Sequence, residues 1–410
     1  MVRNIKTYFL MSFLLIIVTV INIPARNRVE DRLQPYIEAI EAEGEEPIDF
    51  VINKLDEVDL IIFDDALHTA VEPFEFYQEV IKTPSFYKKV KKVFIETASV
   101  NKQQHIDAYF QSEPENRELL YPVFQDDING TGWPMKTYFD LFHTIYVLNR
   151  SLPEKQRLEV IGVDNPTYWS EIKTKRDLEL FQKTLSSRDF SMYKMIAVEL
   201  NYFEDGTKGI FLTNTRHAYK GIKNSKNKFY WNTGTFFHQW HPGKTYSIHF
   251  HSVYLFIEKN EKPAIKFDRI ADGIWDSAFE ALGNNPIAIS LKKNVFGNEE
   301  YIGNHMLNVA PNQTMYDAYD ALIFLGPLEN MRKTAMVDFI YTDKYKIELQ
   351  RRGRILYSDK EIKQMMKKHG VDSLTELIDK AYAAEPEILL PQAQSIQPID
   401  AWKTKDDEDD

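Results

Sequence analysis

The chain has 410 residues, of which 43% are hydrophobic and 27% charged, a composition typical of a globular protein with one large α/β domain or two smaller ones. The net charge of -11 and the pI near 5.5 do not indicate the clustered basic surface on which nucleic-acid binding depends, so we expect no nucleic-acid partner. Cysteine is absent, which excludes disulfides, thiolate metal sites and cysteine nucleophiles.

The N-terminus combines positive charge with an apolar run. Arg3 and Lys6 precede the mostly apolar residues 8–23, a pattern that fits an export signal or a short uncleaved anchor. We therefore expect residues 1–27 to be a signal peptide or membrane anchor and the only membrane contact. The folded part is then extracytoplasmic, whether periplasmic, secreted or anchored.

The rest of the chain alternates between two periodicities. Helical patterns recur in four segments: 29–44, 47–55, 72–81 and 101–110. Apolar, strand-like runs recur in seven: 58–65, 91–99, 157–165, 208–214, 245–256, 285–291 and 320–327. This alternation predicts an α/β fold with a mostly parallel central sheet, helices on both faces and helical additions at the N- and C-termini.

We see no internal repeat or composition shift that divides the middle of the chain. The predicted α/β domain therefore runs from 28 to 344, and charged helices follow from 345 to 388. The polar, acidic end from 389 to 410 is expected to be an extended or disordered tail.

Polar side chains stand at the ends of four predicted strands. Asp65 and His68 follow the first, Glu96 lies near the end of the second, Asp164 ends the third and His217 follows the fourth. Ligands of parallel sheets gather outside the carboxyl ends of the strands. We therefore expect these side chains to lie at one rim.

Each of these groups also has a purely structural reading. Asp65 can orient or share a proton with His68, or Asp64 and Asp65 can cap a helix while His68 stays in a surface loop. Glu96 is either part of a site or a helix N-terminal carboxylate satisfied by backbone amides.

Two further histidine groups allow more than one reading. His217 lies beside Arg216, and the pair can stabilise an anionic intermediate or form a solvated basic loop. His249 and His251 share one face of a strand and can ligate one ion, although an ordinary strand explains them equally. Phosphate loops, G-x-S-x-G elbows and H-E-x-x-H motifs are absent from the sequence.

The order of the strand-end motifs resembles the superfamily of erythromycin esterases, haem-binding ChaN-like proteins and Tiki-type proteases. The first motif, "FDDALHTAVEPF", gives Asp65, His68 and Glu72, and the second, "VFIETAS", gives Glu96. The third motif, "LEVIGVDN", gives Asp164, and the fourth, "FLTNTRHAYKG", gives Asn214 and His217. The last, "YDAYDALIFLGP", gives Asp320 and extends the resemblance over residues 58–327.

The resemblance implies an acid–histidine site that activates water for ester hydrolysis. Its catalytic residues are expected to be Asp65, His68, Glu96 and His217, and its binding residues Glu72, Asp164, Asn214 and Arg216. The sequence departs from the family pattern where Asp65 replaces a glutamate and Thr213 a histidine.

We therefore predict an exported hydrolase of an ester, lactone or peptide. His68 is the expected base, oriented by Asp65 or Glu96, in a cleft lined by Trp133, Trp231 or Trp240. One alternative is a haem- or small-ligand-binding protein on the same scaffold, and another is a catalytically degenerate surface protein. A metal ion or haem is compatible with the sequence but not required by it, and the oligomeric state is open.

Overall fold

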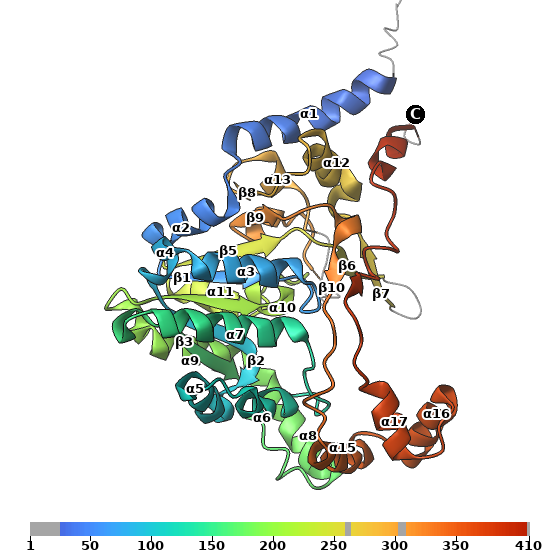
Figure 1. Ribbon diagram of the computed structural model, residues 1–410. Helices are drawn as coiled ribbons and strands as arrows, with labels where there is room; N and C mark the ends of the chain where they lie inside the picture. The colour runs from blue at the N-terminus through green and yellow to red at the C-terminus, as the bar shows by residue number, and fades with distance from the viewer. Residues whose placement is uncertain (1–24, 259–263, 302–308, 408–410) are drawn as a thin grey trace, which may run out of the picture.

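The computed structural model describes residues 25–258, 264–301 and 309–407. At its centre lies a seven-stranded sheet in the order β3-β2-β4-β1-β5-β9-β8 (Figure 1). Its strands are β1 (Leu60–Asp64), β2 (Val90–Ser99), β3 (Glu159–Asp164), β4 (Lys208–Thr213), β5 (Thr245–Phe250), β8 (Ile287–Ser290) and β9 (Ala321–Phe324). All neighbouring pairs are parallel except β8 with β9, which confirms the predicted α/β class and mostly parallel sheet.

Helices precede, separate and follow these strands. They are α1 (Ala25–Glu43), α2 (Pro47–Glu57), α3 (Glu72–Lys82), α4 (Pro84–Tyr87), α5 (Gln103–Gln111), α6 (Tyr121–Gln125), α7 (Lys136–Ser151), α8 (Lys175–Thr184), α9 (Arg188–Glu199), α10 (Thr215–Ala218), α11 (Thr233–Trp240), α12 (Ile274–Ala281), α13 (Val295–Asn298), α14 (Met315–Ala318), α15 (Asp343–Leu356), α16 (Asp359–His369) and α17 (Leu374–Ala381). Two small antiparallel pairs join β6 (Tyr254–Glu258) to β7 (Ala264–Asp268) and β10 (Arg332–Lys333) to β11 (Ile388–Leu389).

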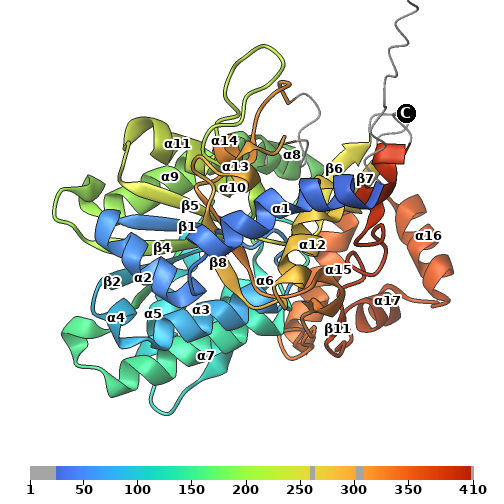
Figure 2. The same cartoon turned by 90° about the horizontal axis from the view of Figure 1, so that it is seen from above.

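The central strands are buried on both faces. In β1, Ile61 and Phe63 pack against the layer that contains α2, α3, α5 and α7, whereas Leu60 and Ile62 pack against α1, α9, α11 and α12 (Figure 2). Successive strand side chains point to opposite faces, so a strand covered on both sides reads as an unbroken apolar run. This explains why the sequence pattern located the strands.

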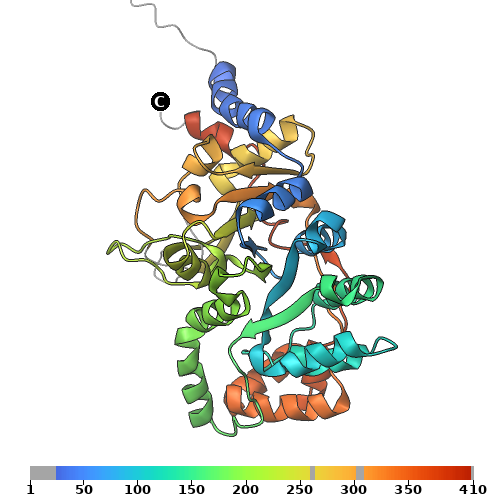
Figure 3. The ribbon, with the colours of Figure 1, turned by 90° about the vertical axis from the view of Figure 1, so that its left-hand side faces the viewer.

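The helical additions lie at opposite ends of the molecule. Figure 3 shows α1 at the top and the orange helices α15, α16 and α17 at the bottom, while the short red C-terminal turn, Ala401–Asp407, lies near α1. Residues 1–24, which hold most of the predicted signal or anchor, fall outside the described residues. Among the described residues, no helix is long and apolar enough to cross a membrane.

Of the two alternatives predicted for 389–410, an extended or a disordered tail, the disordered one does not hold for residues 389–407, which the structure describes. Leu390 and Trp402 are completely buried, and the indole N–H of Trp402 donates a hydrogen bond to Ser277 on α12 (2.8 Å). These apolar anchors are widely spaced in a polar segment, so no periodic pattern marks them in the sequence.

The buried anchor makes a stability prediction. Replacing Trp402 with alanine removes a fully buried indole and should lower the free energy of unfolding by about 3–5 kcal/mol in urea denaturation. Trp240→Ala is the control because Trp240 is 49% exposed, and its loss should cost about 1 kcal/mol or less. Equal small losses in both variants would contradict the docking of the C-terminal segment.

Candidate functional site

The carboxylate of Glu96, near the C-terminal end of β2, lies at the centre of the site. It is 3% exposed, at a point where the pairing of β2 with β3 shifts register. Its Oε2 accepts hydrogen bonds from Thr213 Oγ1 (2.5 Å) and from the Asn214 backbone N–H (3.2 Å). Its Oε1 accepts one from Arg188 Nη2 (2.9 Å). Glu96 thereby joins β2 to the end of β4 and the start of α9.

His68 approaches Glu96 from the loop after β1. A tight turn at Ala66, whose φ is +55°, brings the chain back so that His68 Nδ1 lies 2.7 Å from Asp65 Oδ2. Its other nitrogen, Nε2, lies 3.0 Å from Asn214 Nδ2 and 3.4 Å from Glu96 Oε2. Asp65 and His68 therefore form a buried pair, as their sequence spacing suggested.

His217, in α10, approaches Glu96 from the opposite side. Its Nδ1 lies 2.6 Å from Asp189 Oδ1, and its Nε2 lies 3.0 Å from Arg188 Nη1 and 3.3 Å from Glu96 Oε1. The two imidazoles thus have the same arrangement. In each, Nδ1 contacts an aspartate, and Nε2 lies between an N–H donor and one oxygen of Glu96.

This arrangement suits proton transfer. The amide of Asn214 has a fixed orientation because its Oδ1 caps α10 by accepting the Arg216 backbone N–H (3.1 Å), so Nδ2 faces His68 as a donor. Neutral His68 accepts from Asn214 through Nε2, whereas protonated His68 donates from Nε2 to Glu96. His68 therefore keeps a hydrogen-bond partner in both protonation states, as a general acid–base group requires.

Arg188 places a positive charge beside Glu96 Oε1, the oxygen that faces His217. Its Nε and Nη2 donate to the two oxygens of Asp164 at 2.6 and 3.0 Å, which places the end of β3 in the same network. A bidentate pair of this kind is directional, so it orients the guanidinium toward Glu96 and His217. Asp164 therefore orients Arg188 and also lines the cavity itself.

The charges in the cluster shift the titration of its members. Burial opposes protonation of His68, yet the carboxylates of Asp65 and Glu96 raise its pKa to about 10. Burial likewise opposes protonation of His217, but Asp189 and Glu96 raise its pKa to about 9. Burial raises the pKa of Asp65 to about 6, against the attraction of His68. Burial acts to raise the pKa of Glu96, but the positive charges of His217, His68 and Arg188 hold this pKa well below its ordinary value.

A cavity of about 160 Å³ opens beside this cluster. Of the strand-end residues predicted from the sequence, His68, Glu96, Asp164 and His217 line it, together with several that the sequence did not indicate, whereas Asp65 lies behind His68 and does not line it. Its lining residues are His68, Glu96, Thr97, Asp127, Ile128, Asn129, Trp133, Asp164, Arg188, Asn214, Arg216 and His217. Arg216 is exposed at this cavity, and the ring of Trp133 meets that of His68 edge-on at 5.3 Å.

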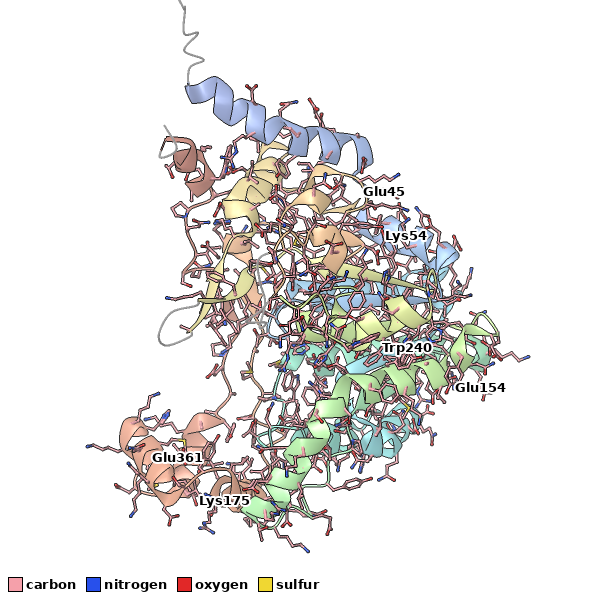
Figure 4. All side chains as sticks on the ribbon, turned by 180° about the vertical axis from the view of Figure 1, so that it is seen from behind. Glu45, Lys54, Glu154, Lys175, Trp240 and Glu361 are labelled. Carbon is pink, nitrogen blue, oxygen red and sulfur yellow. The ribbon has the colours of Figure 1, made fainter. Side chains whose placement is uncertain are left out.

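Other predicted site residues lie elsewhere. Glu72, at the start of α3, accepts a hydrogen bond from Arg332 Nε (2.9 Å) and lines a separate cavity. Trp231 and Trp240 are about half exposed and do not line the site, and Figure 4 shows Trp240 at the surface near α9. The predicted cleft therefore retains Trp133 alone of the three tryptophans.

His249, in β5, and His251, just after it, do not combine into a metal site. His249 Nδ1 lies 2.8 Å from Asp64, whereas His251 Nε2 lies 3.0 Å from Asp276, so each has its own carboxylate. Within the described ranges, no group of three or more histidine, aspartate or glutamate side chains is arranged to hold a metal ion.

The sequence reasoning missed Arg188 and Asp189. Both lie at the N-terminus of α9, which is separated from β3 by a connection that contains α8. An acid in the first turn of a helix looks like ordinary capping. The sequence motif "SRD" carries no spacing signal, and only the topology brings it to β2 and β4.

The loop 126–133 forms one wall of the cavity and is held from behind. Asp127 accepts backbone N–H groups within the loop, including that of Gly132 (2.9 Å), and its own carbonyl accepts the Trp169 indole N–H (2.7 Å). Gly130 has φ +81°, and a Cβ there would lie 2.4 Å from the Trp169 ring. Arg352 of α15 donates to the Gln125 carbonyl (2.9 Å), so the C-terminal helices support this wall.

Comparisons with known proteins bear on the fold. No protein family and no curated protein matches the sequence. A solved structure of a succinoglycan biosynthesis protein is similar, with a TM-score of 0.51 and 10% identity over 72% of this chain and 97% of that chain. An erythromycin esterase mutant in its open conformation aligns with a TM-score of 0.46 and 10% identity over 68% of this chain and 95% of that chain.

A haem-bound ChaN of Campylobacter jejuni also aligns, with a TM-score of 0.30 and 12% identity over 54% of this chain and 91% of that chain. An erythromycin esterase and a ChaN are thus among the structural neighbours. The succinoglycan biosynthesis protein supports the α/β fold of this chain. At these identities the likeness concerns the fold alone.

The raised histidine pKa values predict how stability depends on pH. The stabilisation from His68 and His217 is fully present below about pH 6.5 and is lost as the pH rises through their folded pKa values of about 9 to 10. Urea denaturation should show a decline on the order of several kcal/mol between pH 7 and pH 10. The variant His217→Gln should show a shallower decline.

His143→Gln is the matched control because His143 is exposed and lies outside the site. It should keep the wild-type pH dependence. A pH dependence in His217→Gln identical to that of the wild type would contradict the assigned charge state.

Proposed function

We propose that this protein is a hydrolase that cleaves a small ester, lactone or peptide substrate with His68 as the proton-transfer group. The observation that carries the proposal is the position of His68 Nε2, which lines the cavity between the Asn214 donor and the Glu96 acceptor. Asp65 on Nδ1 fixes the tautomer and stabilises the imidazolium that forms.

The reaction follows from these positions. Neutral His68 removes a proton from a water molecule as the water oxygen bonds to the acyl carbon, and the carbonyl oxygen takes the displaced electron pair. When the tetrahedral intermediate collapses, His68 returns the proton to the leaving oxygen or nitrogen. Glu96 accepts the Nε2–H between the two steps, while Arg188 and His217 keep Glu96 ionised.

The departures from the family pattern do not disrupt this arrangement. The shorter Asp65 still reaches His68 at 2.7 Å, and Thr213, where the family has a histidine, donates a hydrogen bond to Glu96. Both contacts support an active hydrolase over a catalytically degenerate protein.

The size of the cavity supports a reaction site more than a haem site. About 160 Å³ is below the roughly 300–1,000 Å³ typical of ligand pockets, so the cavity suits a scissile bond and its immediate neighbours.

We also propose that the enzyme works outside the cytoplasm. The support is the sequence of residues 8–23 with its positive flank. Substrates would then be small molecules or peptides met in the extracytoplasmic space.

The activity is tested by hydrolysis of p-nitrophenyl acetate. His68→Gln and Glu96→Gln should each lower kcat/KM by about 100-fold or more, since general acid–base catalysis contributes about that much. The wild-type rate should rise with pH from 6 to 9, because the reactive neutral form of His68 becomes more abundant as its pKa of about 10 is approached.

Glu72→Gln is the control because Glu72 lies outside the cavity, and it should retain wild-type kcat/KM. No detectable hydrolysis of esters, lactones or peptides by the wild type, or full activity in His68→Gln, would refute the proposed function.

A further inference from the structure

Aromatic side chains gather on the outer faces of α9 and α11, which lie side by side (Figure 2). Phe190, Trp231 and Trp240 are each between 43% and 49% exposed. Together with Phe236 they form one continuous set of ring contacts, with centroids 4.9–6.2 Å apart. We call these four residues the aromatic surface. Large apolar side chains that are exposed together in this way mark an interaction site.

The spacing of residues along α9 extends the aromatic surface. Phe190, Lys194 and Val198 are four residues apart, so they share one face of the helix, and all three are exposed. Val198 alone is 47% exposed. The outer face of a surface helix is ordinarily polar, so two large apolar side chains on this face indicate a partner for it.

The segment that carries most of the aromatic surface is basic, although the chain as a whole is acidic. Residues 206–257 contain seven Lys or Arg residues and no Asp or Glu, whereas the net charge of the chain is -11. Lys226 and Lys228 are exposed in the turn that leads to Trp231. This turn adjoins the aromatic surface, because the ring of Phe229 lies 5.9 Å from that of Trp231.

The two acids of α9 do not offset this positive charge. Asp189 Oδ1 lies 2.6 Å from His217 Nδ1, and Glu199 Oε2 lies 2.7 Å from Lys92 Nζ. Each carboxylate therefore has its own cationic or ionisable partner. The exposed Lys194 lies between the two acids along the helix.

We propose that the aromatic surface and the adjoining lysines bind the surface of an anionic membrane. Tryptophan and other amphipathic aromatic side chains favour the boundary between lipid headgroups and acyl chains, and lysines favour negatively charged headgroups. The four rings meet at interplanar angles from 32° to 82°, so they form no flat platform on which a planar ligand would stack. The proposal does not depend on the hydrolase function.

The test measures whether the exposed tryptophans touch lipid. Residues 8–23 are also apolar, so sedimentation of the full chain with vesicles would not locate the contact. Trp231 and Trp240 are about half exposed, whereas Trp169, Trp275 and Trp402 are buried. Quenching of tryptophan fluorescence by brominated phosphatidylcholine therefore reports mainly on the aromatic surface.

The full chain should be quenched by vesicles of brominated phosphatidylcholine mixed with phosphatidylglycerol. Vesicles of brominated phosphatidylcholine alone should quench it at least about twofold less, because they lack negative charge. Lys226→Glu combined with Lys228→Glu should lower the affinity for the anionic vesicles by about 10-fold or more. Phe190→Ser, which keeps all tryptophans, should also weaken it by removing an exposed ring.

Lys367→Glu combined with Lys368→Glu is the matched control. It makes the same change of charge on α16, where both lysines are exposed. Figure 4 shows α16, marked by Glu361, far from Trp240. This variant should retain most of the wild-type affinity, and circular dichroism establishes that all variants fold.

Three results would overturn the proposal. The first is equal quenching by the two kinds of vesicle, or no quenching by either. The second is an equal loss of affinity in the α16 control, because the effect would then come from net charge alone. The third is a dimer in sedimentation equilibrium without vesicles that Phe190→Ser dissociates, which would assign the aromatic surface to a second copy of the chain.

Discussion

The buried carboxylate of Glu96 is the interaction on which the site depends. A carboxylate at 3% exposure is strongly disfavoured unless it is compensated, and Glu96 is compensated by Arg188, Thr213 and two imidazoles. Each of its oxygens contacts one histidine, so the two imidazoles are coupled through a single group. The charge that stabilises this corner of the fold is the same charge that controls the protonation of the proposed base.

The surrounding architecture keeps this cluster in place. Parallel strands deliver Asp65, Glu96, Asp164 and Thr213 to one edge of the sheet, and the N-terminus of α9 supplies Arg188. The C-terminal helices contribute from outside the sheet, because Arg352 and Tyr345 hold the Gln125 carbonyl at the start of the cavity wall. Sites of this kind need rigid support, since a displacement of about 1 Å can cost a large fraction of the rate.

The sequence predicted those parts of the molecule that depend on local patterns. The unbroken apolar run of β1 marked a strand buried on both faces, and the polar residues at strand ends marked the rim of the sheet. Long-range packing carried no such signal. Arg188 donates to Glu96 although 92 residues separate them in the sequence. Glu72 forms an ion pair with Arg332 and does not reach the site. The C-terminal segment is held by isolated contacts such as the hydrogen bond from Trp402 to Ser277.

The central claim is that one carboxylate sets the protonation of both histidines. It is tested most directly by NMR titration of histidine-labelled protein, with the imidazole signals of His68 and His217 followed in the wild type and in Glu96→Gln. Loss of an opposite charge within hydrogen-bonding distance should lower both pKa values together, by about one unit or more. A Glu96→Gln protein that folds normally and leaves either pKa at its wild-type value would contradict the account.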